Sequence, residues 1–201
     1  MTLALIDYGA GNLNSVENAL RAAGCTDLTV TADPDVVTRA DRIVLPGVGA
    51  FGACATALRG VSGMVEALEA RVRSDGVPFL GICVGMQLMA EAGEELGTHQ
   101  GLGWIAGRVR RIDPAGTDVK VPHMGWNDVC PVADHPLIVS GEAYFLHSFA
   151  FEGDDVVATT DHAGPVTAAV ARDNMIGVQF HPEKSQRYGL ALLERFLAWH
   201  P

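Results

Sequence analysis

The chain has 201 residues, a length typical of one domain, and 48% of them are hydrophobic, which excludes a disordered chain. Its formal net charge of −10 disfavours nucleic acid and anionic membranes as partners. We therefore expect a single globular domain spanning residues 1–201, with no nucleic-acid partner and no membrane partner.

The sequence suggests neither a targeting signal nor a metal-binding motif. Near the N-terminus only Leu3–Ile6 is apolar, and no basic region precedes it, so a secretory signal is not expected. No apolar run approaches the length of a membrane span. The cysteines are widely spread, which argues against a zinc site or a disulfide framework: Cys25, Cys54, Cys83 and Cys130. We expect a cytoplasmic protein without metal or cofactor.

In the first half of the chain, predicted strands alternate with predicted helices. Short apolar runs predict strands at 3–6, 28–31, 42–45 and 77–82. Helical patterns lie at 15–23, at 64–72 and at 85–92, and Asn14 with Glu17 resembles a capping box for the first helix. Such alternation is typical of a parallel sheet covered by helices on both faces.

The second half is richer in strands. Strands are predicted at 108–112, 127–129, 143–151, 156–160, 166–171 and 175–180, with a turn at 172–174, and a last helix is predicted at 186–198. We expect much antiparallel pairing here and one sheet shared by both halves. The predicted fold is α/β, a mixed, mostly parallel open sheet flanked by helices, with antiparallel strands in the C-terminal half.

Cys83 stands at the end of an apolar run, in the frame Gly81-Ile82-Cys83-Val84-Gly85. A free cysteine usually acts as a small buried hydrophobe. A strand that turns sharply into a helix, with glycines making room, is also the setting of an activated nucleophile. In that setting the following helix stabilises the thiolate, and the amide of Val84 is available to an oxyanion. Both readings of Cys83 stay open on this stretch alone.

His181 and Glu183 follow the strand predicted to end at Phe180. A cysteine nucleophile needs a base, and the base needs an orienting partner. A surface turn with a solvated charge is the alternative. Because ligands gather at the carboxyl edge of open parallel sheets, Cys83 and His181 are expected to meet there.

Two glycine-rich stretches follow predicted strands. Residues 45–52, LPGVGAFG, either aim backbone amides at an oxyanion or form an ordinary strand-to-helix turn. Residues 7–15, DYGAGNLNS, resemble a dinucleotide-binding turn but have Asn14 where the third glycine belongs. A tight turn is therefore favoured over nucleotide binding.

Together these motifs resemble the class I (triad-type) glutamine amidotransferases. The elbow GICVGMQ at 81–87 and the late HPE at 181–183 are typical of the whole family. Further matches resemble the subfamily of glutaminase subunits of imidazole glycerol phosphate synthase: DYGAGN at 7–12, PGVGAF at 46–51, GLGW at 101–104, PHMGWN at 122–127, YFLHSF at 144–149 and GVQFHPEKS at 177–185. They span nearly the whole chain.

The resemblance implies roles for these residues. Cys83 is expected to attack the side-chain amide of L-glutamine, with His181 as base and acid and Glu183 as its orienting partner. The amides of Val84 and of the Val48-Gly49 turn are expected to form the oxyanion hole. Further residues are implied in substrate binding: Gly47, Gln87, Glu95, Ser148 and Phe149.

The resemblance also implies a partner, a (β/α)₈-barrel cyclase subunit that receives the ammonia and makes imidazole glycerol phosphate and an aminoimidazole carboxamide nucleotide in histidine biosynthesis. His123 and Trp126 are expected at that interface, although packing also explains Trp126. His147 fits a core or interface histidine at least as well as a catalytic one. Phe149 departs from the tyrosine common in the subfamily, and Val84 from leucine.

Three alternatives remain on the sequence. One is a related amidotransferase subunit for another acceptor, such as anthranilate or pyridoxal phosphate synthesis. Another is a free-standing cysteine hydrolase acting on peptides or γ-glutamyl conjugates, which would work fully without a partner. A non-catalytic binding module is disfavoured because Cys83, His181 and Glu183 are all present.

Overall fold

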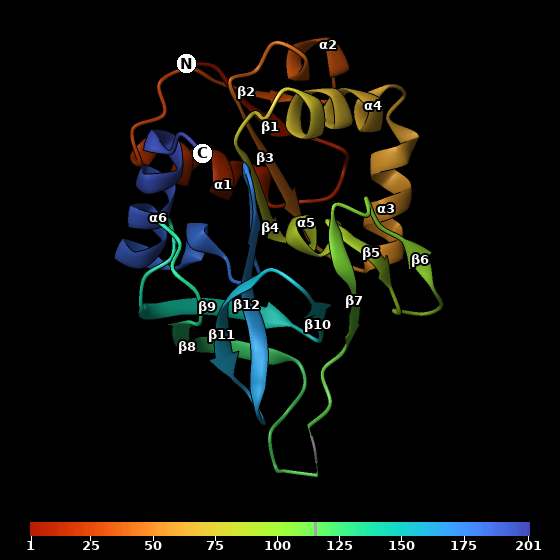
Figure 1. Cartoon of the computed structure of the whole chain (residues 1–201), viewed down its shortest axis with the longest axis vertical. Coiled ribbons are helices and arrows are strands. Elements are labelled where there is room, and N and C mark those ends of the chain that lie inside the picture. Colours follow the sequence, from red (N-terminus) through yellow and green to blue (C-terminus); the bar gives the residue numbers. More distant parts are fainter. Residues whose placement is uncertain (115) are drawn as a thin grey trace.

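The computed structural model describes residues 1–114 and 116–201. Its main sheet has the strand order β2-β1-β3-β4-β13-β12-β11-β8-β9. The first five of these strands run parallel, and helices lie on both sides of them (Figure 1). All residues of these strands are buried except Thr29 and Val30 of the edge strand. The five strands are β2 (Leu28–Thr31), β1 (Leu3–Ile6), β3 (Arg42–Gly47), β4 (Phe79–Cys83) and β13 (Met175–Val178). The predicted parallel strands are thus confirmed, with β4 shifted toward Cys83.

The rest of the main sheet is antiparallel, as the second half of the sequence predicts. Asp173 has a φ of 52°, which marks the predicted turn between β12 and β13. The antiparallel strands are β12 (Pro165–Arg172), β11 (Val156–Asp161), β8 (His123–Pro131) and β9 (Gly141–His147). Along β8 the side chains alternate, so that Met124, Trp126, Asp128 and Cys130 share its exposed face.

A second sheet corrects two predictions. Its order is β10-β7-β5-β6, formed by β10 (Phe149–Gly153), β7 (Ile105–Arg111), β5 (Ala90–Gly93) and β6 (His99–Gln100). The expectation of one shared sheet is therefore incomplete. The helix predicted at 85–92 is wrong beyond Gln87, because a continuously buried apolar run has no periodicity that separates helix from strand. The strand predicted at 143–151 is broken at Ser148, where the chain leaves the main sheet for the second.

Helices lie on both sides of the main sheet in Figure 1, with α1 (Leu13–Ala22) beside α6 (Gln186–Ala198) on one side and α3 (Phe51–Gly60) with α4 (Met64–Leu68) on the other. The capping box predicted from Asn14 and Glu17 is wrong. The helix begins at Leu13, so Asn12 is its N-cap and no side chain caps it. The remaining helical segments are α2 (Pro34–Val37), the π-helical η1 (Glu69–Ser74), α5 (Val84–Gln87) and the 3₁₀ turn η2 (Pro182–Lys184).

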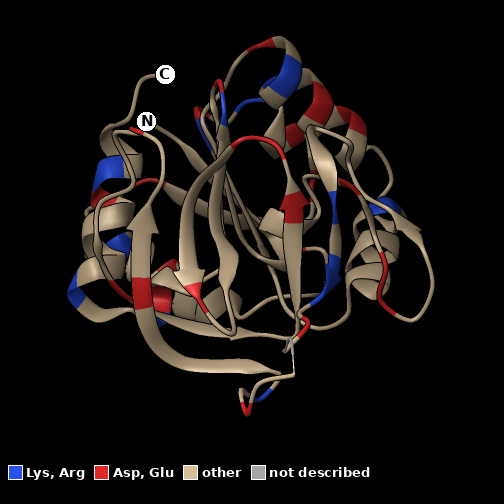
Figure 2. Ribbon diagram, turned by 60° about the horizontal axis from the view of Figure 1, so that its bottom comes forward, with Lys and Arg blue, Asp and Glu red and all other residues tan. Residues whose placement is uncertain are grey.

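One main hydrophobic core runs from Leu3 to Trp199 and joins the sheets to the helices. Figure 2 shows acidic and basic residues spread over many helices, strands and loops. Among the described residues, no helix combines the length and the apolar character that crossing a membrane requires.

The sheet order determines where the candidate site lies. Strands β3, β4 and β13 are neighbours, with Gly47 opposite Cys83 and Val178 opposite Ile82. Segments that leave the carboxyl ends of these three strands therefore converge on Cys83.

Candidate active site

Cys83 occupies a sharp turn between β4 and α5. Its φ of 53° and ψ of −113° are unusual for a residue with a side chain, so the packing around it must hold it there. A Cβ on Gly85 would collide with the carbonyl oxygen of Leu45, which shows how closely the turn packs on β3. The helix α5 has only four residues, so the dipole contribution expected for the thiolate is small.

His181 and Glu183 lie beside this cysteine. Nδ1 of His181 is 2.8 Å from Oε1 of Glu183, and the two side chains are only 4% and 2% exposed. Cys83 lies close enough on the other side of the imidazole to influence the pKa of His181, and both residues line the same cavity. The loop is fixed from behind, because the Ser185 hydroxyl donates to the His181 carbonyl at 2.6 Å and accepts from the Tyr144 amide at 2.9 Å. The structure thus brings the three residues of the expected triad into one line of contacts.

The electrostatics of His181 favour its charged form. Burial alone would lower the pKa of His181, but the hydrogen bonds and negative charges of Cys83 and Glu183 outweigh it and raise this pKa to about 9. An imidazolium between a sulfur and a carboxylate is suited to store the proton taken from a thiol and to return it to a leaving group.

A cavity of about 180 Å³ opens over Cys83 and His181. It is lined mainly by the predicted site residues, namely Val48, Gly49, Cys83, Val84, Gln87, Ser148, Phe149 and His181. Three lining residues were not predicted as site residues: Leu146, His147 and Lys184. Lys184 directly follows the HPE segment, and its ammonium lies 5.7 Å from the ring centre of Tyr144. Its adjacency to the HPE segment is the sequence signal that could have identified Lys184 as a site residue.

The glycine-rich turn after β3 is held by three side chains. The hydroxyl of Tyr8 donates to the Pro46 carbonyl at 2.8 Å, and the thiol of Cys54 donates to the Val48 carbonyl at 3.3 Å. Glu95 accepts from the amide of Phe51 at 2.8 Å. Glu95 and Gly47 both lie outside the cavity lining, at the two ends of this turn.

The side-chain amides of two glutamines connect the cavity wall to the nucleophile. Nε2 of Gln87 donates to the Phe149 carbonyl and to Oε1 of Gln179, each at 3.0 Å. Nε2 of Gln179 in turn donates to the sulfur of Cys83 at 3.7 Å. Gln179 is fully buried and is not among the predicted site residues. The signal was a polar residue inside the apolar run 175–180.

The two expected interface residues lie in different environments. Trp126 is 47% exposed on the open face of β8. His123 points inward from the same strand and is only 3% exposed, stacked on Phe145 with ring centres 4.7 Å apart.

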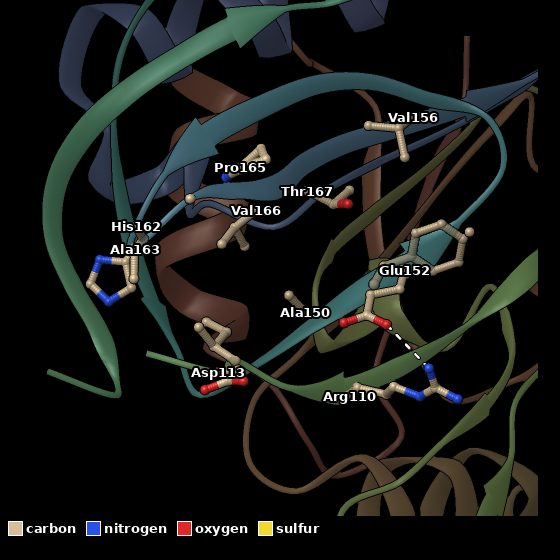
Figure 3. Close-up of a pocket in the computed structure, with 14 residues that line it drawn as sticks. Arg110, Asp113, Ala150, Glu152, Val156, His162, Ala163, Pro165, Val166 and Thr167 are labelled. Carbon is tan, nitrogen blue, oxygen red and sulfur yellow. Dashed lines mark hydrogen bonds and ion pairs between the residues drawn. The ribbon is translucent and has the colours of Figure 1, made fainter. Parts of the chain in front are cut away.

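A second cavity of about 280 Å³ lies away from Cys83, between the second sheet and the β11–β12 hairpin (Figure 3). Arg110 reaches Glu152 across its rim, and the two side chains neutralise each other. Arg110 also pairs with Glu94. His162 and Ala163 stand on the opposite wall. Among the described residues that line this cavity, Arg110 is the one Lys or Arg side chain, and it is paired with glutamates, whereas Lys184 lies at the edge of the cavity over Cys83.

The chain matches known proteins over its full length. A model of the family "Glutamine amidotransferase class-I" matches residues 4–199. A protein of Zymomonas mobilis named "Imidazole glycerol phosphate synthase subunit HisH" is 62% identical over 206 aligned positions, covering 100% of this chain and 97% of that protein. A protein of the same name from Caulobacter vibrioides is 52% identical, covering 100% and 99%.

Solved structures share the fold at low identity. One described as "Crystal structure of glutamine amidotransferase" has a TM-score of 0.76 at 19% identity and covers 98% of each chain. "Structure of PurLQS from Thermotoga maritima" has a TM-score of 0.74 at 19% identity, covering 98% of this chain and 97% of that one. At these identities the likeness concerns the fold alone, and the fold is the expected one.

Proposed function

This chain belongs to the class I glutamine amidotransferase family, and from that premise we propose that it is a single-domain glutaminase subunit of imidazole glycerol phosphate synthase. It hydrolyses L-glutamine to glutamate and ammonia and passes the ammonia to a cyclase subunit. The observation that carries the proposal is the contact line Cys83–His181–Glu183 beneath a cavity open to a small molecule.

The first half of the reaction releases ammonia. The thiolate of Cys83 attacks the side-chain carbonyl carbon of glutamine, and the oxygen becomes an oxyanion that backbone amides of Val84 and the Val48-Gly49 turn stabilise. The C–N bond breaks as His181 gives its proton to the nitrogen, which leaves as ammonia. A γ-glutamyl thioester remains on Cys83.

The second half regenerates the enzyme. His181, now neutral, takes a proton from a water molecule that attacks the thioester carbon. The C–S bond breaks, glutamate leaves, and the imidazolium–thiolate pair is restored. Glu183 keeps Nδ1 of His181 protonated throughout, so that only the other ring nitrogen exchanges protons.

A partner follows from the fate of the product. Ammonia becomes ammonium in water near neutral pH and loses its nucleophilicity, so a synthetic use needs a route that excludes water. The relatives named as synthase subunits support a separate acceptor chain, for which we propose the (β/α)₈-barrel cyclase in a heterodimer. The exposed apolar face of β8, with Met124 and Trp126, is the proposed docking surface.

The test is glutamate release from glutamine by the wild type and by Cys83→Ala, each alone, with the cyclase, and with the cyclase plus its nucleotide substrate. Strong release in the full mixture and a loss of about a thousandfold or more in Cys83→Ala are expected. Equal release without any partner would instead favour the free-standing hydrolase. Stimulation by the barrel subunit of another pathway, and not by this cyclase, would favour a different acceptor.

A further inference from the structure

A buried pair of histidines stands directly behind the cavity wall. His147 lines the cavity, His123 lies behind it, and Nδ1 of His123 is 3.0 Å from Nε2 of His147. His123 is also stacked on His162, with ring centres 4.1 Å apart. His162 lines the second cavity (Figure 3). The proposed mechanism uses neither His123 nor His147, although buried polar side chains are costly unless they are fully paired.

The contacts of Asn127 fix the position of the proton on His123. The amide nitrogen of Asn127 donates to the Asp161 carbonyl at 2.8 Å, and its oxygen accepts from the Asp128 amide at 2.9 Å, so the orientation of this amide is determined. The same nitrogen lies 3.0 Å from Nε2 of His123. Because an amide NH₂ can only donate, Nε2 of His123 accepts, and the proton of the neutral ring is on Nδ1.

The contact between His147 and Phe149 independently fixes the proton position on His147. Nδ1 of His147 is 2.9 Å from the Phe149 carbonyl, which can only accept, so the proton of this ring is also on Nδ1. Nε2 of His147 is then free to accept from Nδ1 of His123. Every donor in the chain Asn127–His123–His147–Phe149 faces an acceptor, and both rings are neutral.

The surroundings keep the rings neutral. Burial and the neighbouring His147 and His162 lower the pKa of His123 to about 3. Burial, together with His162 and His181, lowers the pKa of His147 to about 4, although its bond to the Phe149 carbonyl acts in the opposite direction. At neutral pH the hydrogen-bond direction is therefore fixed.

We propose that His147, with His123 behind it, is a positioning residue for the glutaminase reaction: it fixes the Phe149 carbonyl, which orients the amide of Gln87 and, through it, the amide of Gln179 that donates to Cys83. The carbonyl of Phe149 receives bonds from both His147 and Gln87. If it shifts, Gln87 loses one of its two acceptors, and the segment at Ser148 that lines the glutamine cavity is released. This inference rests on the proposed function.

The kinetic test compares two replacements that each keep one half of the ring's hydrogen bonding. His147→Asn retains a donor near the Nδ1 position, whereas His147→Gln retains an acceptor near Nε2 and loses that donor. In the complex with the cyclase, we expect His147→Asn to keep KM for glutamine within about threefold and His147→Gln to raise it about tenfold or more. A merely structural role would lower kcat similarly in both variants and leave KM unchanged, and that result would overturn the proposal.

A second measurement uses the wild-type chain, so it depends neither on the folding of a variant nor on enzyme activity. Nitrogen-15 NMR of the imidazoles in the wild-type chain at pH 7 is expected to show both His123 and His147 as neutral Nδ1–H tautomers. A cation or an Nε2–H tautomer at either ring would overturn the inference. If the wild-type complex released no glutamate, the proposed function would fail, while the tautomers would still decide the hydrogen-bond chain.

Discussion

His181 lies between a sulfur and a carboxylate, and both neighbours favour its protonated form. Since its pKa is raised to about 9, we expect kcat/KM for glutamine to fall as pH rises through about 9, when the proton needed by the departing ammonia is lost. A pH–rate profile of the complex with the cyclase measures this. An alkaline limit near the ordinary histidine value of 6.5 would contradict the ion-pair description.

The same shift predicts a change of stability with pH. A pKa raised in the folded state stabilises the fold fully below the unfolded value near 6.5, and this contribution is lost as pH rises through about 9. Glu183→Gln removes one cause of the shift. The free energy of unfolding of the wild type should therefore fall more steeply between pH 6.5 and 9 than that of Glu183→Gln. Parallel pH curves would show that Glu183 does not stabilise the imidazolium.

Glycine at position 85 is required by the close approach of the nucleophile turn to β3. A Cβ there would collide with the Leu45 carbonyl, which cannot move without disturbing the sheet. We expect Gly85→Ala to lower the free energy of unfolding by about 3 kcal/mol, measured by urea denaturation. Gly60→Ala is the control, because a Cβ at the end of α3 meets open space and should change stability by less than about 1 kcal/mol. Equal losses in both variants would refute the packing argument.

At the scale of elements, a single buried arginine joins the C-terminal helix to the sheet. Nε of Arg42, on β3, donates to the Leu197 carbonyl at 2.9 Å, and its guanidinium donates to the Trp199 carbonyl at 2.7 Å. The charge also suits the C-terminal end of α6. Arg42→Ala would leave two carbonyls unpaired, and a loss of about 2–4 kcal/mol in the free energy of unfolding is expected.

Arg39→Ala is the matched control for this prediction. Arg39 is exposed, and no hydrogen bond or ion pair joins its side chain to the described residues, so its removal should change stability by less than about 0.5 kcal/mol. Thermal unfolding of both variants by circular dichroism separates them. If Arg42→Ala unfolded like Arg39→Ala, the helix would be held by its apolar face alone.

The elements that the sequence predicts well are those with one dominant signal. Strands β1 to β4 are short apolar runs ending in turns, and α6 has an apolar stripe through Leu193 and Leu197. Strand β5 is not predicted because its four residues continue the buried run that begins before Cys83, and only Glu91 among them is exposed, which is too short a pattern to separate strand from helix. The break at Ser148 was missed because strand pairing, not local pattern, decides where β9 ends and β10 begins.

The residues of the candidate site also differ in how well the sequence predicts their contacts. Cys83 ends β4, and Val48 and His181 come soon after the ends of β3 and β13, so the rule that parallel strands share a carboxyl edge is enough to bring them together. The contacts of Glu95 and Gln179 depend on loop paths and on the interior of the fold, which periodicity does not determine. The contact of Gln179 with the nucleophile is therefore visible only in three dimensions.

On the scale of the whole molecule, the proposed docking surface on β8 presents two large apolar side chains to solvent. Met124 is 66% exposed, and Trp126 is packed edge-on against Tyr144 at 6.2 Å rather than buried. Because large aromatic side chains dominate interface energies, we expect Trp126→Ala to raise the Kd for the cyclase about tenfold or more. The melting temperature of the Trp126→Ala variant should stay within about 2 °C of that of the wild type. Titration calorimetry and thermal unfolding measure the two effects.

Leu96→Ala serves as the control for docking. Leu96 is 93% exposed on the turn between β5 and β6, distant from β8 in Figure 1, and its removal should leave the Kd unchanged. A Kd unaffected by Trp126→Ala but raised by Leu96→Ala would place the partner on the second sheet instead.

The alternation of side chains along β8 has a practical consequence for thiol chemistry. Cys130 is exposed on the same face as Trp126, whereas Cys25, Cys54 and Cys83 are buried. A maleimide dye will therefore label Cys130 first, and early incorporation of label will not indicate a blocked nucleophile. If the partner covers this face, labelling slows in the complex, so the chain carries a native reporter of its own assembly.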